Sequence, residues 1–293
     1  GGTQTQTETQ AEVDEDKRQE GNKGKERKMI ETLQDVEKVL DHGFVRLVDH
    51  MGGDARIVEA ARVSYASNAK PNTPAEQTRL INYLLKNRHT SPFEQVVLVF
   101  HCKMPIFVAR QWVRHRTARL NEVSARYTEL PEEYYVPDPA NVLAQSATNK
   151  QGRDGELSAE IAGMFAEDCS RAGHLDFNQY KRALVAGVAR ELARINLPLS
   201  TYTEWYWQID LHNLFHFLGL RLDSHAQYEI RVYAEALYGF AKLVAPIACA
   251  AFEEHVLGAV TFSATEVKEM RKHFLAMVYE HPKELLDKIG WEK

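Results

Sequence analysis

Cysteine is scarce in this chain of 293 residues, which contains only Cys102, Cys169 and Cys249. Because the three are odd in number and far apart, they exclude both a disulfide framework and a CxxC motif for zinc or redox chemistry. Each lies in a predicted strand, helix or apolar run, where a cysteine is more often a small packing residue than a nucleophile. We therefore expect a reducing, cytoplasmic setting.

Long apolar runs are also missing. The most apolar segment, residues 236–252, contains Lys242 and Pro246, whereas a membrane-spanning helix needs about 20 largely apolar residues. Residues 1–28 lack the apolar core of a signal peptide, and their only aliphatic side chains are Ala11 and Val13. We therefore expect no membrane segment, a disordered tail over residues 1–28 and one folded domain over residues 29–293.

Neither a strong excess of one charge nor a glycine-rich phosphate loop is present. The 36 basic and 41 acidic residues give a net charge of −5, which is too balanced for a protein that coats nucleic acid or anionic membrane with its whole surface. Glycine is absent between Gly53 and Gly152, and no G-x-G-x-x-G or P-loop motif occurs anywhere. Any nucleotide phosphate must therefore be held by side chains.

Hydrophobic periodicity and capping signals predict a mixed α+β domain with a helix-rich second half. Strands are expected from Gly43 to the Gly-Gly turn at 52–53, over residues 96–104, and over residues 201–209, where Thr201, Thr203, Trp205, Trp207 and Ile209 share one face. One helix is expected to carry Ile57, Ala60, Ala61 and Val63 on one side; others are expected to begin at Thr73-Pro74, Pro105, Asp210, Asp223 or Ser224, and Ser263, and to end near His89, Gly187 and Pro198. Residues 131–155, rich in Pro, Asn, Asp and Gln, are expected to form a long surface loop.

Residues 110–127, RQWVRHRTARLNEVSARY, carry the densest chemical signal. They contain five arginines and a single acid, a local charge of +4 in an acidic chain. A solvated basic helix face is the simpler explanation of such a run, but polar and apolar residues alternate with the arginines and favour a ligand site. Because arginine holds phosphate through two parallel hydrogen bonds and stacks on heterocycles, the segment predicts a nucleotide site.

Within this segment, Arg114-His115-Arg116 followed by seven residues and Ser124 resembles the RHR-x7-S signature of the flavin-dependent thymidylate synthases. Further segments resemble the family in the same order: GFVRLVDHMG from Gly43, AARVSY, SPFE at 91–94, IFVARQWVRHR, ELARINLPLSTY and LRLDSHAQYEI. The resemblance extends from about Gly43 to Ile230. Arg119 and Ala125 depart from the serine and glycine that many members have, but they leave the signature intact.

The resemblance implies the family's fold and reaction. Members convert dUMP to dTMP with a methylene group from methylenetetrahydrofolate and reducing equivalents from NADPH, which pass through bound FAD, and they use no cysteine nucleophile. The resemblance further implies a homotetramer with shared active sites and with dUMP, folate and NADPH as partners. From the charge balance and the missing motifs we expect no nucleic-acid, membrane or metal partner.

The family's functional residues carry over to matching positions of this sequence. For dUMP the resemblance implies Gln111, Arg114, Glu122, Ser124, Ala125, Arg126, Arg194 and Arg221. For FAD it implies Ser64, Ser91, Glu94, Arg114, His115, Arg116, Asn121, Glu122, Asp210, His212 and His216, of which the last three replace the Asn, Arg and Asn of some members.

Arg221 and His89 are the expected catalytic groups. A guanidinium against the uracil edge favours the polarised ring and makes its C5 a better nucleophile. His89 corresponds to a histidine near the flavin and folate, where it would help to orient the pterin. In isolation, both residues also fit a purely structural role at the C-terminus of a helix.

Two other classes of function can be drawn from the same residues. A hydrolytic metal site would use His212 and His216, four apart on a predicted helix, with Asp223, His225 and Glu229 following. It lacks the glutamate of HExxH. A nucleic-acid binder would use the arginine segment with Trp112 and Tyr127 as stacking groups, but the basic run is short and no nucleic-acid-binding motif is present.

Overall fold

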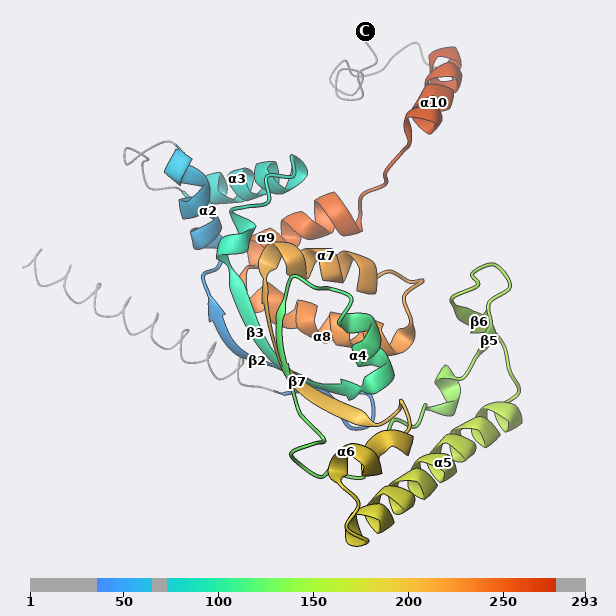
Figure 1. Cartoon of the computed structure of the whole chain (residues 1–293). Helices are drawn as coiled ribbons and strands as arrows, with labels where there is room; N and C mark the ends of the chain where they lie inside the picture. The colour runs from blue at the N-terminus through green and yellow to red at the C-terminus, as the bar shows by residue number, and fades with distance from the viewer. Residues whose placement is uncertain (1–35, 65–72, 278–293) are drawn as a thin grey trace, which may run out of the picture. The chain divides into compact units, whose positions relative to one another are not determined.

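The chain is built around a five-stranded antiparallel sheet (Figure 1). A computed structural model describes residues 36–64 and 73–277, so the expected boundary at residue 28 lies outside the described residues. The strands lie in the order β1 (Glu37–Val39), β2 (Gly43–Met51), β3 (Val97–Pro105), β7 (Tyr202–Asp210) and β4 (Arg119–Glu122). The expected strands β2, β3 and β7 are confirmed, whereas β1 and β4 were not predicted.

One face of the sheet is buried beneath helices. On β7, Thr203, Trp205, Trp207 and Ile209 are each at most 5% exposed, as their alternation predicts. Figure 1 shows α4 (Ile106–Trp112), α7 (Leu211–Arg221) and α8 (Tyr228–Val244) over this face. The buried residues of β7 therefore lie beneath these three helices.

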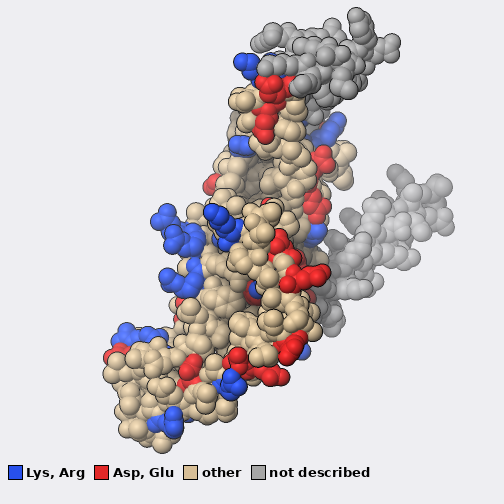
Figure 2. Space-filling view, turned by 90° about the vertical axis from the view of Figure 1, so that its right-hand side faces the viewer, with Lys and Arg blue, Asp and Glu red and all other residues tan. Residues whose placement is uncertain are grey.

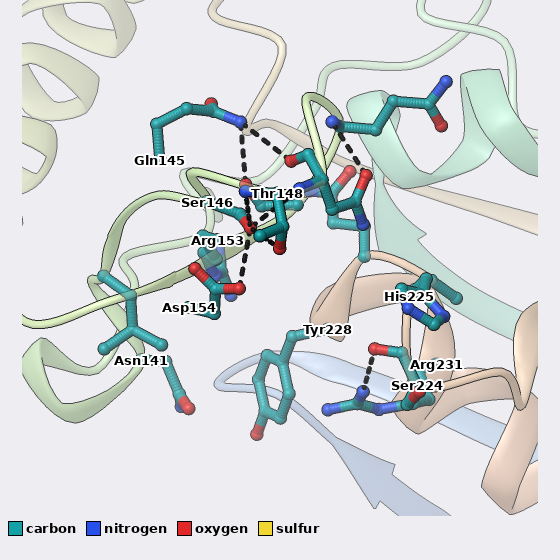
Figure 3. A pocket seen from close by; sticks show the side chains of 16 residues that line it. Asn141, Gln145, Ser146, Thr148, Arg153, Asp154, Ser224, His225, Tyr228 and Arg231 are labelled. Atoms are coloured by element: carbon teal, nitrogen blue, oxygen red, sulfur yellow. Dashed lines mark hydrogen bonds between the residues drawn. The ribbon is translucent and has the colours of Figure 1, made fainter.

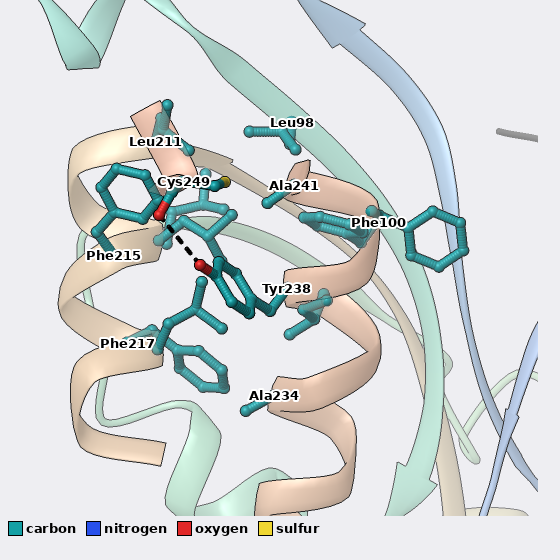
Figure 4. Close-up of a cluster of buried hydrophobic side chains, with 14 of the residues drawn as sticks. Leu98, Phe100, Leu211, Phe215, Phe217, Ala234, Tyr238, Ala241 and Cys249 are labelled. Atoms are coloured by element: carbon teal, nitrogen blue, oxygen red, sulfur yellow. Dashed lines mark hydrogen bonds between the residues drawn. The ribbon is translucent and has the colours of Figure 1, made fainter. Parts of the chain in front are cut away.

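Aromatic side chains hold the helices to the sheet. Trp112 of α4 is fully buried, and its ring lies edge-on to those of Trp205 and Trp207, with centroids 5.4 and 5.2 Å apart. Edge-to-face contacts of this kind add to the hydrophobic stabilisation of large buried rings. Between α7 and α8, Phe215 and Tyr238 lie near Cys249 of α9 (Pro246–Phe252), and the Tyr238 hydroxyl donates to the Cys249 carbonyl (3.2 Å) (Figure 4). Cys249 is therefore a core residue, as expected.

The remaining helices of this part begin and end largely where their sequence signals place them. They are α2 (Asp54–Arg62), α3 (Pro74–Lys86), the 3-10 turn η2 (Phe93–Gln95), α5 (Ala159–Val185), α6 (Arg190–Ala193) and the 3-10 turn η4 (Arg194–Asn196). Thr73 and Glu76 form a reciprocal capping box at α3, and the Asp210 side chain accepts a hydrogen bond from the Asn213 backbone N–H at α7 (2.9 Å). Both caps are confirmed.

Three local expectations are wrong. The helix α8 begins at Tyr228 with Gln227 as its N-cap, because Asp223 instead accepts from the backbone N–H of His225 and closes a separate turn (2.7 Å). Val63 is 79% exposed, since α2 ends at Arg62 before that residue. The expected loop over residues 131–155 contains the 3-10 turn η3 (Pro139–Asn141) and a hairpin of β5 (Ala144–Gln145) and β6 (Arg153–Gly155).

The described residues from Glu253 onward belong to a second compact unit, distinct from the unit that holds the described residues before it. Its described part contains the π-helical turn η5 (Glu253–Leu257) and α10 (Ala264–Met277). Ser263 and Glu266 form the capping box expected there, with the Glu266 backbone N–H donating to the Ser263 hydroxyl and Glu266 Oε2 accepting from the Ser263 backbone. Among the described residues, no helix has the length and apolar character to cross a membrane.

Candidate active site

The arginine-rich segment falls into a helix end, a connection and an edge strand. The helix expected to begin at Pro105 extends only from Ile106 to Trp112, and β4 then pairs Arg119–Glu122 with β7. Arg114 and Arg116 lie in the connection and are exposed. The residues of the signature are thus held between two buried elements, α4 and β7, although they lie at the surface.

His115 and Arg221 meet although they come from distant segments. Nε of Arg221, the last residue of α7, donates a hydrogen bond to Nε2 of His115 (3.3 Å). The His115 ring also lies against Phe217, with centroids 4.9 Å apart, and 5.9 Å from the ring of His216. The structure therefore brings together the expected catalytic arginine and two expected flavin-binding histidines.

The electrostatics of this pair keep the histidine neutral. Burial and the nearby charge of Arg221 lower the pKa of His115 to about 4, and His216 adds to the effect. A neutral imidazole can accept the Arg221 hydrogen bond, whereas a protonated one cannot. Partial burial also lowers the pKa of Arg221 from its ordinary value, but a guanidinium remains charged in proteins. The positive charge of the pair therefore resides on Arg221.

Gln111, in the last turn of α4, belongs to a second hydrogen-bonded group. Its side-chain amide donates to the carbonyl of Gln227, whose own amide donates to Glu229 Oε2 (2.8 Å). Glu229 is only 2% exposed and also accepts from Arg153 (2.8 Å) and Tyr135 (3.2 Å). The sequence named Glu229 only as a candidate ligand of the rival metal site, and it did not indicate Gln227, Arg153 or Tyr135 as its partners.

A small cavity gathers a different set of expected dUMP residues. Glu122, Ala125 and Arg194 line a hollow of about 130 Å³ next to Thr201 and Thr203. The Thr203 hydroxyl donates to Glu122 Oε1 (2.5 Å). The Thr201 hydroxyl is buried without a hydrogen-bond partner among the described residues, and a buried polar group of this kind calls for a partner. The cavity thus combines a cationic group with an unsatisfied hydroxyl.

Ser124 and Arg126 lie next to this cavity in sequence. The Ser124 hydroxyl accepts from the Arg126 backbone N–H (3.3 Å), and Arg126 Nε lies 3.3 Å from a carboxylate oxygen of Glu191 on α6. Both charged side chains are more than half exposed, so the ion pair is weak. The Arg126 guanidinium can exchange this partner for an anionic ligand at little cost.

Another set of residues expected to bind FAD lies around the turn that precedes β3. Ser91 and Glu94 flank Phe93, which is buried and packs towards Phe215 of α7, with ring centroids 6.3 Å apart. His89 is exposed after α3, edge-on to Tyr83 at 5.8 Å. Ser64 is exposed just after α2. The turn is thereby anchored next to the first residues of α7.

The helix α7 connects this turn to the His115–Arg221 pair. Near its N-terminus lie Asp210 and His212, and further along it lie His216 and Arg221. Its 11 residues span roughly 16 Å at about 1.5 Å per residue. Both carboxylate oxygens of Asp210 accept from Asn213, at 2.9 and 2.7 Å, so this side chain already has a structural role as the helix cap.

A larger hollow lies elsewhere. Its volume is about 840 Å³, and it lies between the β5–β6 hairpin and the segment 224–231 (Figure 3). The Tyr228 ring stands in it, with the guanidinium carbons of Arg153 and Arg231 at 5.8 and 6.0 Å from the ring centroid. The sequence did not indicate this hollow. It borders Gln227, and hence the hydrogen-bonded group of Gln111.

The geometry disfavours the two rival functions. Residues 36–64 and 73–277 contain no group of three or more potential metal ligands; His225 is bonded to Asp223 (2.8 Å) and Glu229 to Arg153 instead. Trp112 is buried in the core, so it cannot stack on a nucleobase. On the face shown in Figure 2, basic residues form separate groups beside acidic ones and not a continuous basic surface.

Comparisons with known proteins agree with the signature. Residues 46–247 match the family described as "Thymidylate synthase complementing protein". A flavin-dependent thymidylate synthase of Treponema denticola is 57% identical over 235 residues, which cover 80% of this chain and 88% of the relative. One of Rickettsia prowazekii is 45% identical over 278 residues, covering 89% and 92%. A solved UMP/dUMP methylase of Streptomyces cacaoi, bound with 5-Br dUMP, has a TM-score of 0.68 and 35% identity, covering 75% of this chain and 98% of its own.

Proposed function

Because the chain belongs to the flavin-dependent thymidylate synthase family, we propose that it methylates dUMP to dTMP with methylenetetrahydrofolate as carbon donor and NADPH as reductant. The observation that carries the proposal is the hydrogen bond between Arg221 of α7 and His115 of the RHR signature. The Streptomyces cacaoi neighbour is named a UMP/dUMP methylase, so the uracil nucleotide is the substrate class, and dUMP is the member that we assign.

Arg221 is the group that activates the pyrimidine. A partly buried guanidinium stabilises a developing negative charge more strongly than an exposed one, because water screens its charge less. Placed against the uracil edge, it stabilises the anionic form of the ring and makes C5 nucleophilic. His115 fixes the direction of Arg221 by accepting its Nε–H, which leaves the terminal N–H groups of Arg221 for the substrate.

The small cavity is the proposed phosphate end of the site. Arg194 lines it, Arg126 lies next to it in sequence, and the Thr201 hydroxyl there needs a partner. Glu122, fixed by Thr203, provides an acceptor for a sugar or base donor. A dianionic phosphate would replace the weak Arg126–Glu191 pair with a stronger charge-assisted contact.

FAD is the proposed flavin, and it supplies the reducing equivalents when bound. The donors along α7 and beside it suit it: His212 and His216 lie on the helix, Ser91 on the adjoining turn, and His115 next to Arg221 at the helix end. Imidazole, hydroxyl and guanidinium groups are the side-chain donors that a nucleotide needs where no glycine loop exists. His89, near the same turn, is the proposed pterin-side group.

The proposed assembly is a homotetramer with shared sites. No hydrogen bond or ion pair between described side chains joins the His115–Arg221 pair to the cavity residues Glu122 and Arg194. One nucleotide can bind both kinds of group if one copy supplies the first and a neighbouring copy the second.

The cysteines support a mechanism without an enzyme thiolate. Cys102 and Cys249 are at most 1% exposed, and burial raises the pKa of Cys102 well above its ordinary value. Partial burial and the neighbouring Asp168 also raise the pKa of Cys169. A thiol with a raised pKa is a poor nucleophile at neutral pH.

The test is reconstitution of the purified protein with FAD. We expect a bound-flavin spectrum that NADPH bleaches, and dTMP formation only when dUMP and methylenetetrahydrofolate are both present. Stoichiometric zinc with no flavin retention would point to the hydrolase instead. Methylation of UMP in preference to dUMP would overturn the substrate assignment while leaving the reaction class intact.

A further inference from the structure

Glu229 is a buried carboxylate with a full set of donors. It is 2% exposed, and a charge in such a position must be paired and hydrogen-bonded. Its Oε1 accepts from Arg153 (2.8 Å) and Tyr135 (3.2 Å), and its Oε2 accepts from Gln227 (2.8 Å). Two of these donors come from the 131–155 segment, so the carboxylate ties that segment to α8.

The charge of Glu229 determines which way the next two amides face. An ionised carboxylate only accepts hydrogen bonds, so Gln227 must turn its NH2 group towards it. The carbonyl of Gln227 then faces Gln111, which must in turn donate from its own NH2 group. Of the Gln111 amide, the carbonyl oxygen and one N–H remain for a ligand, in a single orientation instead of two.

We propose that Gln227 and Glu229 are positioning residues that set the orientation of the Gln111 amide for the uracil nucleotide. The inference rests on the proposed function, in which Gln111 contacts dUMP. A free glutamine amide can flip and present either group, and the site would then lose part of its affinity in the wrong orientation. The hydrogen-bonded series Glu229–Gln227–Gln111, called the relay below, fixes the orientation of the Gln111 amide before the nucleotide binds. This is preorganisation.

A purely structural role makes a different prediction. If Gln227 only capped α8 or held the 131–155 segment, its loss would lower stability and would weaken dUMP binding independently of Gln111. If it acts through Gln111, its effect on dUMP disappears once Gln111 can no longer hydrogen-bond. A double-mutant cycle separates the two cases because residues that act as a unit are not additive.

The cycle uses Gln111→Met, Gln227→Met and the double variant, since methionine keeps the length of the side chain without its hydrogen bonds. Dissociation constants for dUMP come from calorimetry on the FAD-loaded protein, with thermal midpoints recorded alongside. We expect Gln227→Met to weaken dUMP about three- to tenfold, the value of one hydrogen bond, and the double variant to bind like Gln111→Met alone. Glu235→Gln, an exposed change on the same helix, is the matched control and should leave affinity within about twofold.

The relay would be overturned if the two single losses of dUMP affinity multiplied in the double variant. It would also be overturned if Gln227→Met bound dUMP as tightly as the wild type. If the wild-type protein binds no dUMP, the proposed function fails and the relay with it. If the wild type binds but Gln111→Met binds equally well, the function stands and the relay is overturned. Should Gln227→Met not fold, Glu229→Gln takes its place in the cycle, because it removes the charge at constant volume and should give the same non-additivity.

Discussion

The neutral His115 beside Arg221 makes the stability of the protein depend on pH in a defined window. Burial and the Arg221 charge lower the pKa of His115 from 6.5 to about 4 in the folded chain, while in the unfolded chain it titrates near 6.5. Below 6.5 the unfolded state binds the proton first, so stability decreases as the pH falls and stops changing because of this residue below about 4. Above 6.5 both states are neutral and the residue contributes no pH dependence.

The size of the effect follows from the same two values. One pH unit corresponds to about 1.36 kcal/mol, so the full difference is about 3 kcal/mol, and about 1–2 kcal/mol after discounting for the partial exposure of the ring. His115→Gln is the informative variant, because its amide can still accept a hydrogen bond from Arg221 but does not titrate.

The assay is urea unfolding of both proteins from pH 4 to pH 8. We expect the free energy of unfolding of His115→Gln, relative to wild type, to rise by about 1–2 kcal/mol between pH 6.5 and 4 and to be constant above pH 7. All other titrating groups cancel in the comparison. A difference that is flat over the whole range, or one that falls towards acid, would refute the neutral histidine.

Three further results are expected. Trp112→Ala should lower the free energy of unfolding by about 3–5 kcal/mol in urea titrations, because its buried ring joins α4 to β7; a loss under about 1 kcal/mol would contradict that packing. Asp210→Ala should cost about 1 kcal/mol of stability and Asp210→Ser much less, since serine also caps helices; equal losses would point to a role other than capping. Replacement of Cys102, Cys169 and Cys249 together by alanine should leave measurable dTMP formation, and complete loss in a folded variant would contradict the cysteine-independent mechanism.

Local sequence patterns predict much of the fold. The alternation of Trp205 and Trp207 on β7 and the capping residues Thr73 and Asp210 depend on interactions within a few residues. They were predicted because the physical cause and the sequence signal lie in the same short stretch. The RHR signature was equally local, and it identified the segment that holds His115.

The missed features depend on distant partners. The edge strand β4 has the sequence RLNE, without the β-branched residues that signal a strand, and it exists because it pairs with β7. The sequence alone does not show that Glu229 is a buried charge, because its ion-pair partner Arg153 comes from a distant segment that was expected to be a loop. The start of α8 was misjudged because Asp223 uses its capping oxygen on His225. Such competition between partners is decided by the tertiary structure.

The central claim is that Arg221 activates the pyrimidine while the flavin chemistry proceeds without it, and one measurement separates the two. In the FAD-loaded Arg221→Ala variant, we expect dTMP formation to fall by about 10²–10³-fold or more, whereas bleaching of the flavin by NADPH persists. Arg110→Ala, a change of an exposed arginine on α4, is the matched control and should retain both. Near-normal dTMP formation by Arg221→Ala would contradict the account.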